Sequence, residues 1–202
     1  MKISSAEFIA GAADAGGLLK TDLHQIAVVG KSNVGKSSFI NYFANDGKLA
    51  RVSKQPGRTK MINYFLINKQ FILADLPGYG YAEVSKAEKA RWADLIEHYL
   101  NNEPQLCYVV FLVDIRHDPT TDDLIMYNFL FKTNVPYLIV ATKADKIPRS
   151  QIAAKKHRLA GFFRVGAENI LPISSQAKTG MEQVYQKIDN ILSYADSITK
   201  VE

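Results

Sequence analysis

Apolar runs of strand length recur along this chain, and segments with helical spacing of apolar positions separate most of them. The runs predict strands over residues 26–29, 62–67, 71–74, 108–113, 137–141 and 170–173. The helical spacing predicts helices over residues 36–44, 86–100, 120–132, 150–163 and 181–194. Strands and helices therefore alternate over most of the chain.

The alternation predicts an α/β fold with helices on both faces of a sheet. The near-continuous apolar run 108–113 is typical of a parallel strand that helices cover on both sides. The short connection 68–70 allows a hairpin, so we expect strands 62–67 and 71–74 to be antiparallel. The predicted sheet is six-stranded and mostly parallel, with one antiparallel strand. Asp118 and Pro119 suit the N-cap and first position of the third helix.

The length of 202 residues suits one domain. We expect an N-terminal extension over residues 1–21, the domain itself over 22–196 and a C-terminal tail over 197–202. Residues 1–19 resist assignment to a helix or strand, and we interpret them as a packing extension before the first strand.

Composition indicates an ordinary soluble protein, with 47% hydrophobic and 22% charged residues. The lone Cys107 cannot form an intramolecular disulfide, which fits a reducing compartment. Glu7 and Asp14 interrupt the N-terminal apolar residues, and no run approaches the roughly 18 apolar residues that span a bilayer. We therefore expect a cytoplasmic protein that does not bind membranes.

The formal net charge of +5 does not by itself indicate a nucleic-acid partner, because such an excess is common among small proteins. Residues 48–60 contain five basic side chains and no acidic one, so they form either a partner-facing loop or a solvated loop beside bound phosphates. Residues 155–158, with sequence KKHR, are a second basic tract, for which a solvated helix face is the simpler interpretation.

Residues 30–37 read GKSNVGKS and fit the G-x-x-x-x-G-K-[ST] pattern between a predicted strand and a predicted helix. Glycines allow backbone N–H groups to close around phosphate oxygens, although a simple glycine turn can match the pattern by chance. Lys36 would lie between the β and γ phosphates, and the Ser37 hydroxyl would ligate Mg²⁺. The phosphate-binding residues are predicted to be Gly30, Lys31, Ser32, Asn33, Val34, Gly35, Lys36, Ser37 and Ser38.

Further polar motifs follow other predicted strands, at the sheet edge where α/β proteins bind ligands. After strand 71–74 come Asp75, Leu76, Pro77 and Gly78. Asp75 would reach Mg²⁺ through water, and the Gly78 N–H would approach the γ-phosphate. A capped β-turn uses the same residue types.

After strand 137–141 come Thr142, Lys143, Ala144 and Asp145, the [NT]KxD pattern of guanine-specific sites. Asp145 would accept hydrogen bonds from N1–H and the 2-amino group of guanine, while Lys143 would lie over the ring. If the sequence had no phosphate-loop motif, we would interpret this tetrapeptide as an ordinary polar loop. The backbone N–H groups of Ser174, Ser175 and Gln176, after the last strand, would meet the guanine O6.

The segment between the first helix and the second strand would supply a switch threonine to Mg²⁺. Thr59 is the candidate, and a Pro-Gly turn with an uninvolved threonine is the alternative. The residues assigned there to nucleotide binding are Gly57, Arg58, Thr59, Lys60 and Met61. Catalytic roles are predicted for Lys36, Thr59 and Gly78, and Mg²⁺ contacts for Ser37, Thr59 and Asp75.

In order, these motifs resemble the five nucleotide-binding motifs of translation-factor-type GTPases. Residues 30–38, 56–59, 142–146 and the DLPGYGYA stretch at 75–82 are similar, more narrowly, to the EngB (YihA/YsxC) family. The resemblance implies a P-loop GTPase fold and a monomeric GTP/GDP switch. It also implies assembly of the large ribosomal subunit, with its rRNA and ribosomal proteins as partners, and a role in cell division and septation.

Tyr79 stands where many Ras-like enzymes carry the glutamine that orients the attacking water, so intrinsic hydrolysis should be slow. Asn33 matches the position at which related potassium-activated GTPases hold K⁺, and the alternative is that it only shapes the loop. Two rival functions are a P-loop phosphotransferase or ATPase of small-molecule metabolism and a Ras-like membrane regulator. The guanine motif disfavours the first, and the missing lipidation motif and glutamine disfavour the second.

Overall fold

The computed structural model describes residues 1–50, 61–80 and 85–199. Seven strands in this part of the chain form one sheet in the order β1-β3-β4-β2-β5-β6-β7. The strands are β1 (Ala6–Ala12), β2 (Gln25–Gly30), β3 (Ile62–Ile67), β4 (Phe71–Asp75), β5 (Leu106–Asp114), β6 (Tyr137–Thr142) and β7 (Ile170–Pro172). The helices are α1 (Lys36–Phe43), α2 (Lys86–Asn102), α3 (Thr121–Thr133), α4 (Arg149–Phe163) and α5 (Met181–Thr199).

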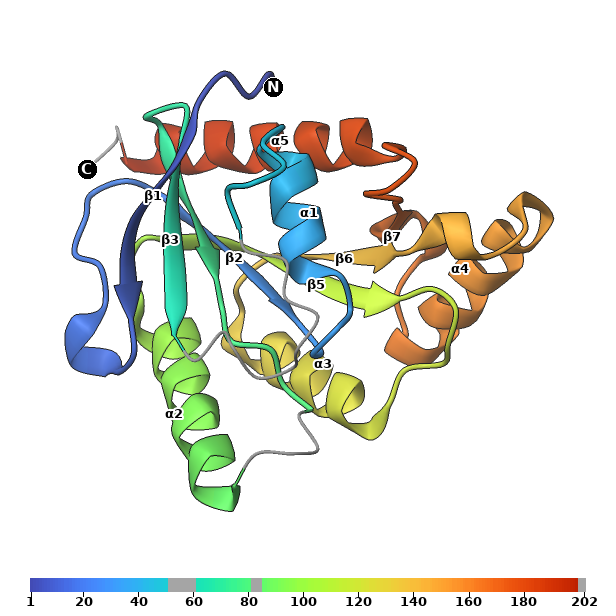
Figure 1. Ribbon diagram of the computed structural model, residues 1–202, viewed down its shortest axis with the longest axis horizontal. Coiled ribbons are helices and arrows are strands. Elements are labelled where there is room, and N and C mark those ends of the chain that lie inside the picture. The colour runs from blue at the N-terminus through green and yellow to red at the C-terminus, as the bar shows by residue number, and fades with distance from the viewer. Residues whose placement is uncertain (51–60, 81–84, 200–202) are drawn as a thin grey trace.

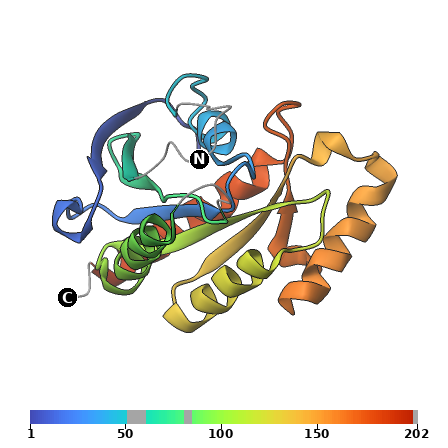
Figure 2. The same cartoon turned by 60° about the horizontal axis from the view of Figure 1, so that its bottom comes forward.

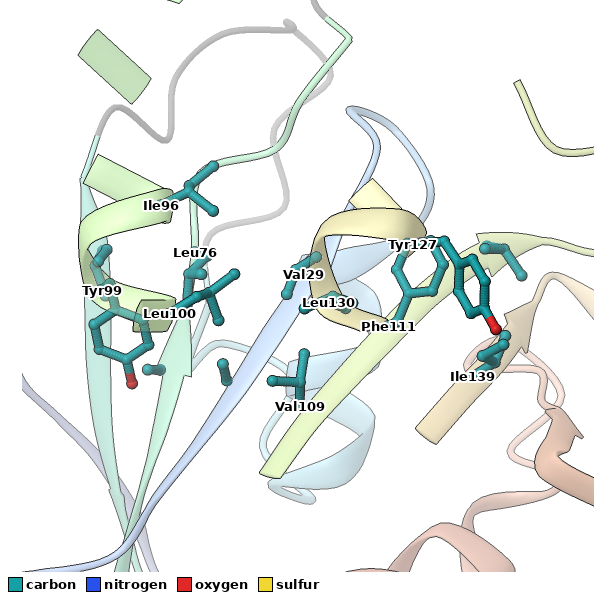
Figure 3. Packing of buried hydrophobic residues seen from close by; sticks show 14 of the residues in the cluster. Val29, Leu76, Ile96, Tyr99, Leu100, Val109, Phe111, Tyr127, Leu130 and Ile139 are labelled. Carbon is teal, nitrogen blue, oxygen red and sulfur yellow. The ribbon is translucent and has the colours of Figure 1, made fainter. Parts of the chain in front are cut away.

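Helices cover both faces of the sheet, as the alternating pattern predicted. Helices α2, α3 and α4 lie on one face, and α1 and α5 lie on the other (Figures 1 and 2). On the first face, Tyr99 of α2, Leu130 of α3 and Phe163 of α4 belong to one buried cluster with side chains of the sheet, part of which Figure 3 shows. On the second face, Phe39 of α1 and Val184 of α5 belong to the other cluster. Burial on both faces explains the continuous apolar runs of β2 and β5.

The prediction of six strands is wrong by one, because residues 6–12 form the edge strand β1. It pairs antiparallel with β3, which also pairs antiparallel with β4. β3 is therefore the single strand that runs against the others, as expected. Most of β1 is exposed, and its register shifts between Phe8 and Ala10. Because an edge strand with a bulge buries little of either face, its sequence lacks the alternation that identifies a strand.

Two helix ends differ from their predictions. Thr120, rather than Asp118, is the N-cap of α3, and it forms a reciprocal capping box with Asp123. Helix α5 continues to Thr199 and so includes part of the expected tail. No helix in the described ranges is long and apolar enough to cross a membrane.

The loops that contain the predicted site residues follow the parallel strands of the sheet. β4, β2, β5, β6 and β7 all run in the same direction, so their carboxyl ends meet at one edge of the sheet. This edge brings together the segments after Gly30, Asp75, Asp114, Thr142 and Pro172.

Candidate nucleotide-binding site

The loop between β2 and α1 has the backbone that a phosphate cradle requires. Gly35, at the N-cap of α1, has φ 105°, and Asn33 has φ 63°. A Cβ on Gly30 would lie 2.9 Å from Cγ1 of Val34 and 3.0 Å from the carbonyl oxygen of Leu112. Glycine is therefore required at position 30 by close packing and at position 35 by its left-handed backbone. The first turn of α1 has no side-chain cap at Gly35, and its N–H groups favour an anion.

The predicted phosphate lysine and the predicted magnesium aspartate are direct partners. Lys36, in the first turn of α1, forms a buried ion pair with Asp75, the last residue of β4. Asp75 lies opposite Val28 of β2 in the parallel register. The two motifs thus meet at adjacent strand ends, with one positive and one negative group in a region shielded from water.

The Thr-Lys-Ala-Asp motif is tied to the phosphate loop by two side chains. The Thr142 hydroxyl lies 2.7 Å from the carbonyl oxygen of Val34 and 3.1 Å from that of Val113. Lys143, with φ 62°, donates to the carbonyl oxygen of Asn33 at 2.6 Å. These bonds place the proposed guanine-reading segment directly beside the loop that would hold the phosphates.

Asp145 is held as a carboxylate by the loop that follows β7. The Ser174 hydroxyl donates to Asp145 Oδ1 at 2.6 Å, and Lys146 Nζ lies 3.1 Å from Oδ2. The hydrogen bond from Ser174 is the largest cause of a lowered Asp145 pKa, with Lys146 contributing. Lys146 Nζ also donates to Gln176 Oε1 at 2.8 Å. An ionised carboxylate fixed in this way presents two acceptor oxygens, as recognition of N1–H and a 2-amino group requires.

A cavity of about 320 Å³ lies between α1 and the loop after β7. Ser38 and Tyr42 of α1 line one side, and Ser175, Gln176 and Lys178 line the other. Ser38, Ser175 and Gln176 are the predicted nucleotide-binding residues that border this cavity.

Asp114, which the sequence interpretation missed, fixes Lys143 from the other side. Its Oδ2 accepts a hydrogen bond from Lys143 Nζ at 2.8 Å, and Arg116 donates to both carboxylate oxygens. Burial opposes ionisation of Asp114, but the hydrogen bonds from Arg116 and Lys143 outweigh it and lower the pKa to about 2. Its place at the carboxyl end of β5 is the feature of the sequence that could have identified it.

A second contact that the sequence did not predict connects the segment after Asp75 to α3. The Tyr79 hydroxyl donates to Asp123 Oδ1 at 2.8 Å, and the Ser32 N–H donates to the Tyr79 carbonyl oxygen at 2.8 Å. Burial is the main cause of a raised Tyr79 pKa, and the Asp123 charge adds to it. Lys31 Nζ donates to the Thr120 hydroxyl at 3.2 Å. Tyr79 therefore lies against the phosphate loop, with its hydroxyl bound to a carboxylate.

The five residues predicted between α1 and β3 fall into two groups. Gly57, Arg58, Thr59 and Lys60 lie outside the described residues, so their roles stay predictions. Met61 is 39% exposed and lies beside β1, where its Sδ would be 2.7 Å from a Cβ on Gly11. Its described contact is therefore with β1, and its nucleotide contact also stays a prediction.

Comparison with known proteins adds independent support. A family model described as "50S ribosome-binding GTPase" matches residues 25–143. A probable GTP-binding protein EngB of Clostridioides difficile is 42% identical over 196 residues, which are 94% of each chain. The chain belongs to the EngB family. An EngB protein of Alkaliphilus metalliredigens is 44% identical over 192 residues, 95% of this chain and 92% of that protein.

Solved structures agree with the EngB assignment. The crystal structure of a probable GTP-binding protein EngB matches with a TM-score of 0.69 and 27% identity, covering 84% of this chain and 99% of that one. Era in complex with MgGDPNP and nucleotides 1506–1542 of 16S ribosomal RNA has a TM-score of 0.69 at 23% identity. That match covers 85% of this chain and 57% of the Era chain, and at this identity it shows the same fold. As an EngB protein, this chain is a GTP-binding protein and a GTPase.

Proposed function

We propose that this protein is a GTP-operated switch that acts in assembly of the large ribosomal subunit, with an associated role in cell division and septation. The observation that carries the nucleotide-binding part of the proposal is Lys143, which bonds to the Asn33 carbonyl of the phosphate loop while Asp145, two residues further on, accepts a hydrogen bond from Ser174. One side chain thus ties the phosphate-binding loop to the base-reading loop. A guanine nucleotide that spans both loops would fix their relative position.

Mg²⁺ fits the donor set of this site. Mg²⁺ prefers hard oxygen ligands and is usually held by one or two carboxylates together with substrate phosphates. Ser37 and Asp75 supply a hydroxyl and a carboxylate beside Lys36, and Thr59 is proposed as a further ligand. When bound, the ion would neutralise charge that develops on the phosphates during transfer.

The residues proposed for hydrolysis would orient the nucleotide and neutralise charge on its phosphates, and none of them would form a covalent bond. Lys36 would neutralise the β and γ phosphates, and the Gly78 N–H would donate to the γ-phosphate. The Tyr79 side chain has no amide, and its hydroxyl is bound to Asp123, so it does not replace a water-orienting glutamine. We therefore propose slow intrinsic hydrolysis, with K⁺ at Asn33 as the hypothesis for its stimulation.

The proposed partner is the large ribosomal subunit or its precursor, through rRNA and ribosomal proteins. The description of the matching family model, a 50S ribosome-binding GTPase, supports this partner. We further propose a monomer that works in the cytoplasm without binding membranes. A switch of this kind needs different affinities for its partner in the GTP and GDP states.

Co-sedimentation with precursors of the large subunit tests the proposal. The wild-type protein should sediment with the particles in one nucleotide state more than in the other. Asp145→Asn should lose this difference, because it loses the guanine nucleotide, and Asp22→Asn on the exposed surface should retain it. Binding that is the same with GTP, with GDP and without nucleotide would overturn the proposed switch.

A further inference from the structure

Helix α4 is a strongly basic segment of this protein. Four of its fifteen residues are Lys or Arg, none is acidic, and the whole chain has a formal charge of +5. The cations are Arg149, Lys155, Lys156 and Arg158, and His157 lies among them. The helix packs beside the edge strand β7 and lies at the outer end of the molecule in both views (Figures 1 and 2).

The two sides of α4 differ in shape as well as charge. Leu159, Ala160 and Phe163 are buried against the sheet. Along the exposed side, four residues with short side chains and one histidine recur at helical spacing, with cations on the flanks, of which Lys155 and Lys156 are half-buried. Its residues are Ser150, Ala153, Ala154, His157 and Gly161. A Cβ on Gly161 would meet no heavy atom of the described chain within 4 Å beyond its own helix. A partner can therefore approach the α4 backbone closely between two positively charged flanks.

The sequence of α4 is poorly suited to helix stability alone. Arg149 begins the helix, where a positive charge opposes the helix dipole, and Pro148 provides no side-chain cap. Gly161 is a weak helix former without a packing reason within the described protein. Arg164 at the C-terminal end has φ 51°, a left-handed conformation that favours glycine. Residues that are unfavourable for local structure are most often found at functional sites.

We propose that the exposed side of α4 binds the phosphate backbone of RNA. Phosphate contacts are made mainly by Lys and Arg, and close backbone approach suits a sugar-phosphate chain. An amphipathic helix that binds membranes instead presents several large apolar residues outward. In α4 the exposed aromatic side chain is Phe162, which lies under Arg158 with 5.8 Å between the guanidinium carbon and the ring centroid. This inference rests on the proposed function, because it assigns a surface to the rRNA partner.

Contacts of α4 also reach the nucleotide site. Lys155 Nζ donates to the Arg116 carbonyl oxygen at 3.1 Å, and Arg158 forms two hydrogen bonds of 2.5 Å with the Asp118 carboxylate. Both partners lie in the loop that follows Asp114, the last residue of β5 and the residue that fixes Lys143. RNA phosphates would compete with Asp118 for Arg158, so RNA binding is coupled to the loop beside the guanine site.

Binding to purified rRNA and to large-subunit precursor particles tests this assignment over a series of salt concentrations. Arg149→Glu/Lys156→Glu should weaken binding about tenfold or more and reduce the slope of log affinity against log salt by about two, one for each lost phosphate contact. Lys20→Glu/Lys187→Glu, an equal charge change on exposed positions of other elements, should retain the wild-type slope. Gly161→Ala should raise the midpoint of thermal unfolding and yet weaken binding, which separates the surface from the stability of the fold.

The outcomes distinguish this inference from the proposed function. If the wild type binds precursor particles and Arg149→Glu/Lys156→Glu binds them equally well, the α4 surface is wrong and the ribosomal partner stands. If the wild type binds in no nucleotide state, the proposed function fails and the α4 surface fails with it. If poly-glutamate displaced bound rRNA from the protein as effectively as free rRNA does, RNA would be overturned as the occupant of the α4 surface. If Gly161→Ala bound rRNA as well as the wild type, close approach of RNA at Gly161 would be overturned.

Discussion

The ammonium group of Lys36 is bound to the carboxylate of Asp75 in the buried space between the ends of β2 and β4. Phosphate oxygens attract ammonium groups, so a nucleotide bound as proposed would compete with Asp75 for Lys36. Release of Asp75 would free this carboxylate for the metal ion. Exchange of partners at Lys36 would therefore link nucleotide binding to the segment after β4.

Removal of the Asp75 charge should destabilise the protein in the absence of nucleotide. Asp75→Asn leaves the buried Lys36 without its counterion, and breaking such a pair costs about 3–5 kcal/mol. We expect a lower free energy of unfolding in urea, with GTP restoring part of it because phosphates supply negative charge. Asp22→Asn, on the exposed surface, is the control. Equal stability of both variants without nucleotide would show that the pair contributes nothing.

Asp145 should decide the identity of the base. Two hydrogen bonds to a charged group are worth about 3–6 kcal/mol, so Asp145→Asn should weaken GTP binding by about two to four decades. Xanthosine triphosphate has a carbonyl in place of the 2-amino group and should bind the variant better than GTP does. For the wild type, inosine triphosphate should bind more weakly than GTP, because it lacks the 2-amino group. Calorimetry with the three nucleotides tests this, and an unchanged GTP affinity in Asp145→Asn would contradict the assignment.

Asp114 should contribute stability that is lost in acid. Its pKa is about 2 in the folded protein, below its usual value of 3.8, so its contribution is present above pH 4 and disappears as the pH falls toward 2. The shift corresponds to about 2 kcal/mol near neutral pH. The free-energy difference between wild type and Asp114→Asn, measured in urea, should therefore shrink between pH 4 and pH 2. A difference that is independent of pH would show that Arg116 and Lys143 do not stabilise the charge.

The Tyr79 hydroxyl should hold the segment after Asp75 on the phosphate loop. Tyr79→Phe removes a hydrogen bond to the Asp123 carboxylate, worth about 1.5–3 kcal/mol. Hydrogen exchange of the Ser32 amide, which donates to the Tyr79 carbonyl, should then become faster. The raised Tyr79 pKa keeps the hydroxyl protonated, so the effect should be the same from pH 6 to pH 9. Tyr194→Phe, at a tyrosine that is 64% exposed, is the matched control and should leave exchange at Ser32 unchanged.

Monovalent cations test the role of Asn33. Single-turnover GTP hydrolysis should be several-fold faster in KCl than in NaCl, and Asn33→Ala should lose the difference. The carbonyl oxygen of Asn33 would still accept from Lys143 in that variant, because the bond uses the backbone. Equal wild-type rates in the two salts would rule out the K⁺ hypothesis.

The sequence predicted the elements whose burial imposes a regular pattern. Strands such as β5 and helices such as α1 were located within one or two residues at each end, because parallel strands covered on both faces must be apolar. β1 was missed because an exposed edge strand needs no such pattern. The motifs could be predicted because their chemistry uses residues that are close in sequence. The contacts of Asp114 with Lys143 and of Tyr79 with Asp123 could not, since they join segments 29 and 44 residues apart.

The two edge strands of the sheet, β1 and β7, are short or irregular for different reasons. β7 spans only Ile170–Pro172, and β1 is interrupted by the register shift between Phe8 and Ala10. Neither border offers a long, regular ladder of unpaired backbone groups that another polypeptide could extend. The architecture thereby opposes fibre growth and strand exchange between copies, and helices and loops are left as the surfaces for contact with other molecules.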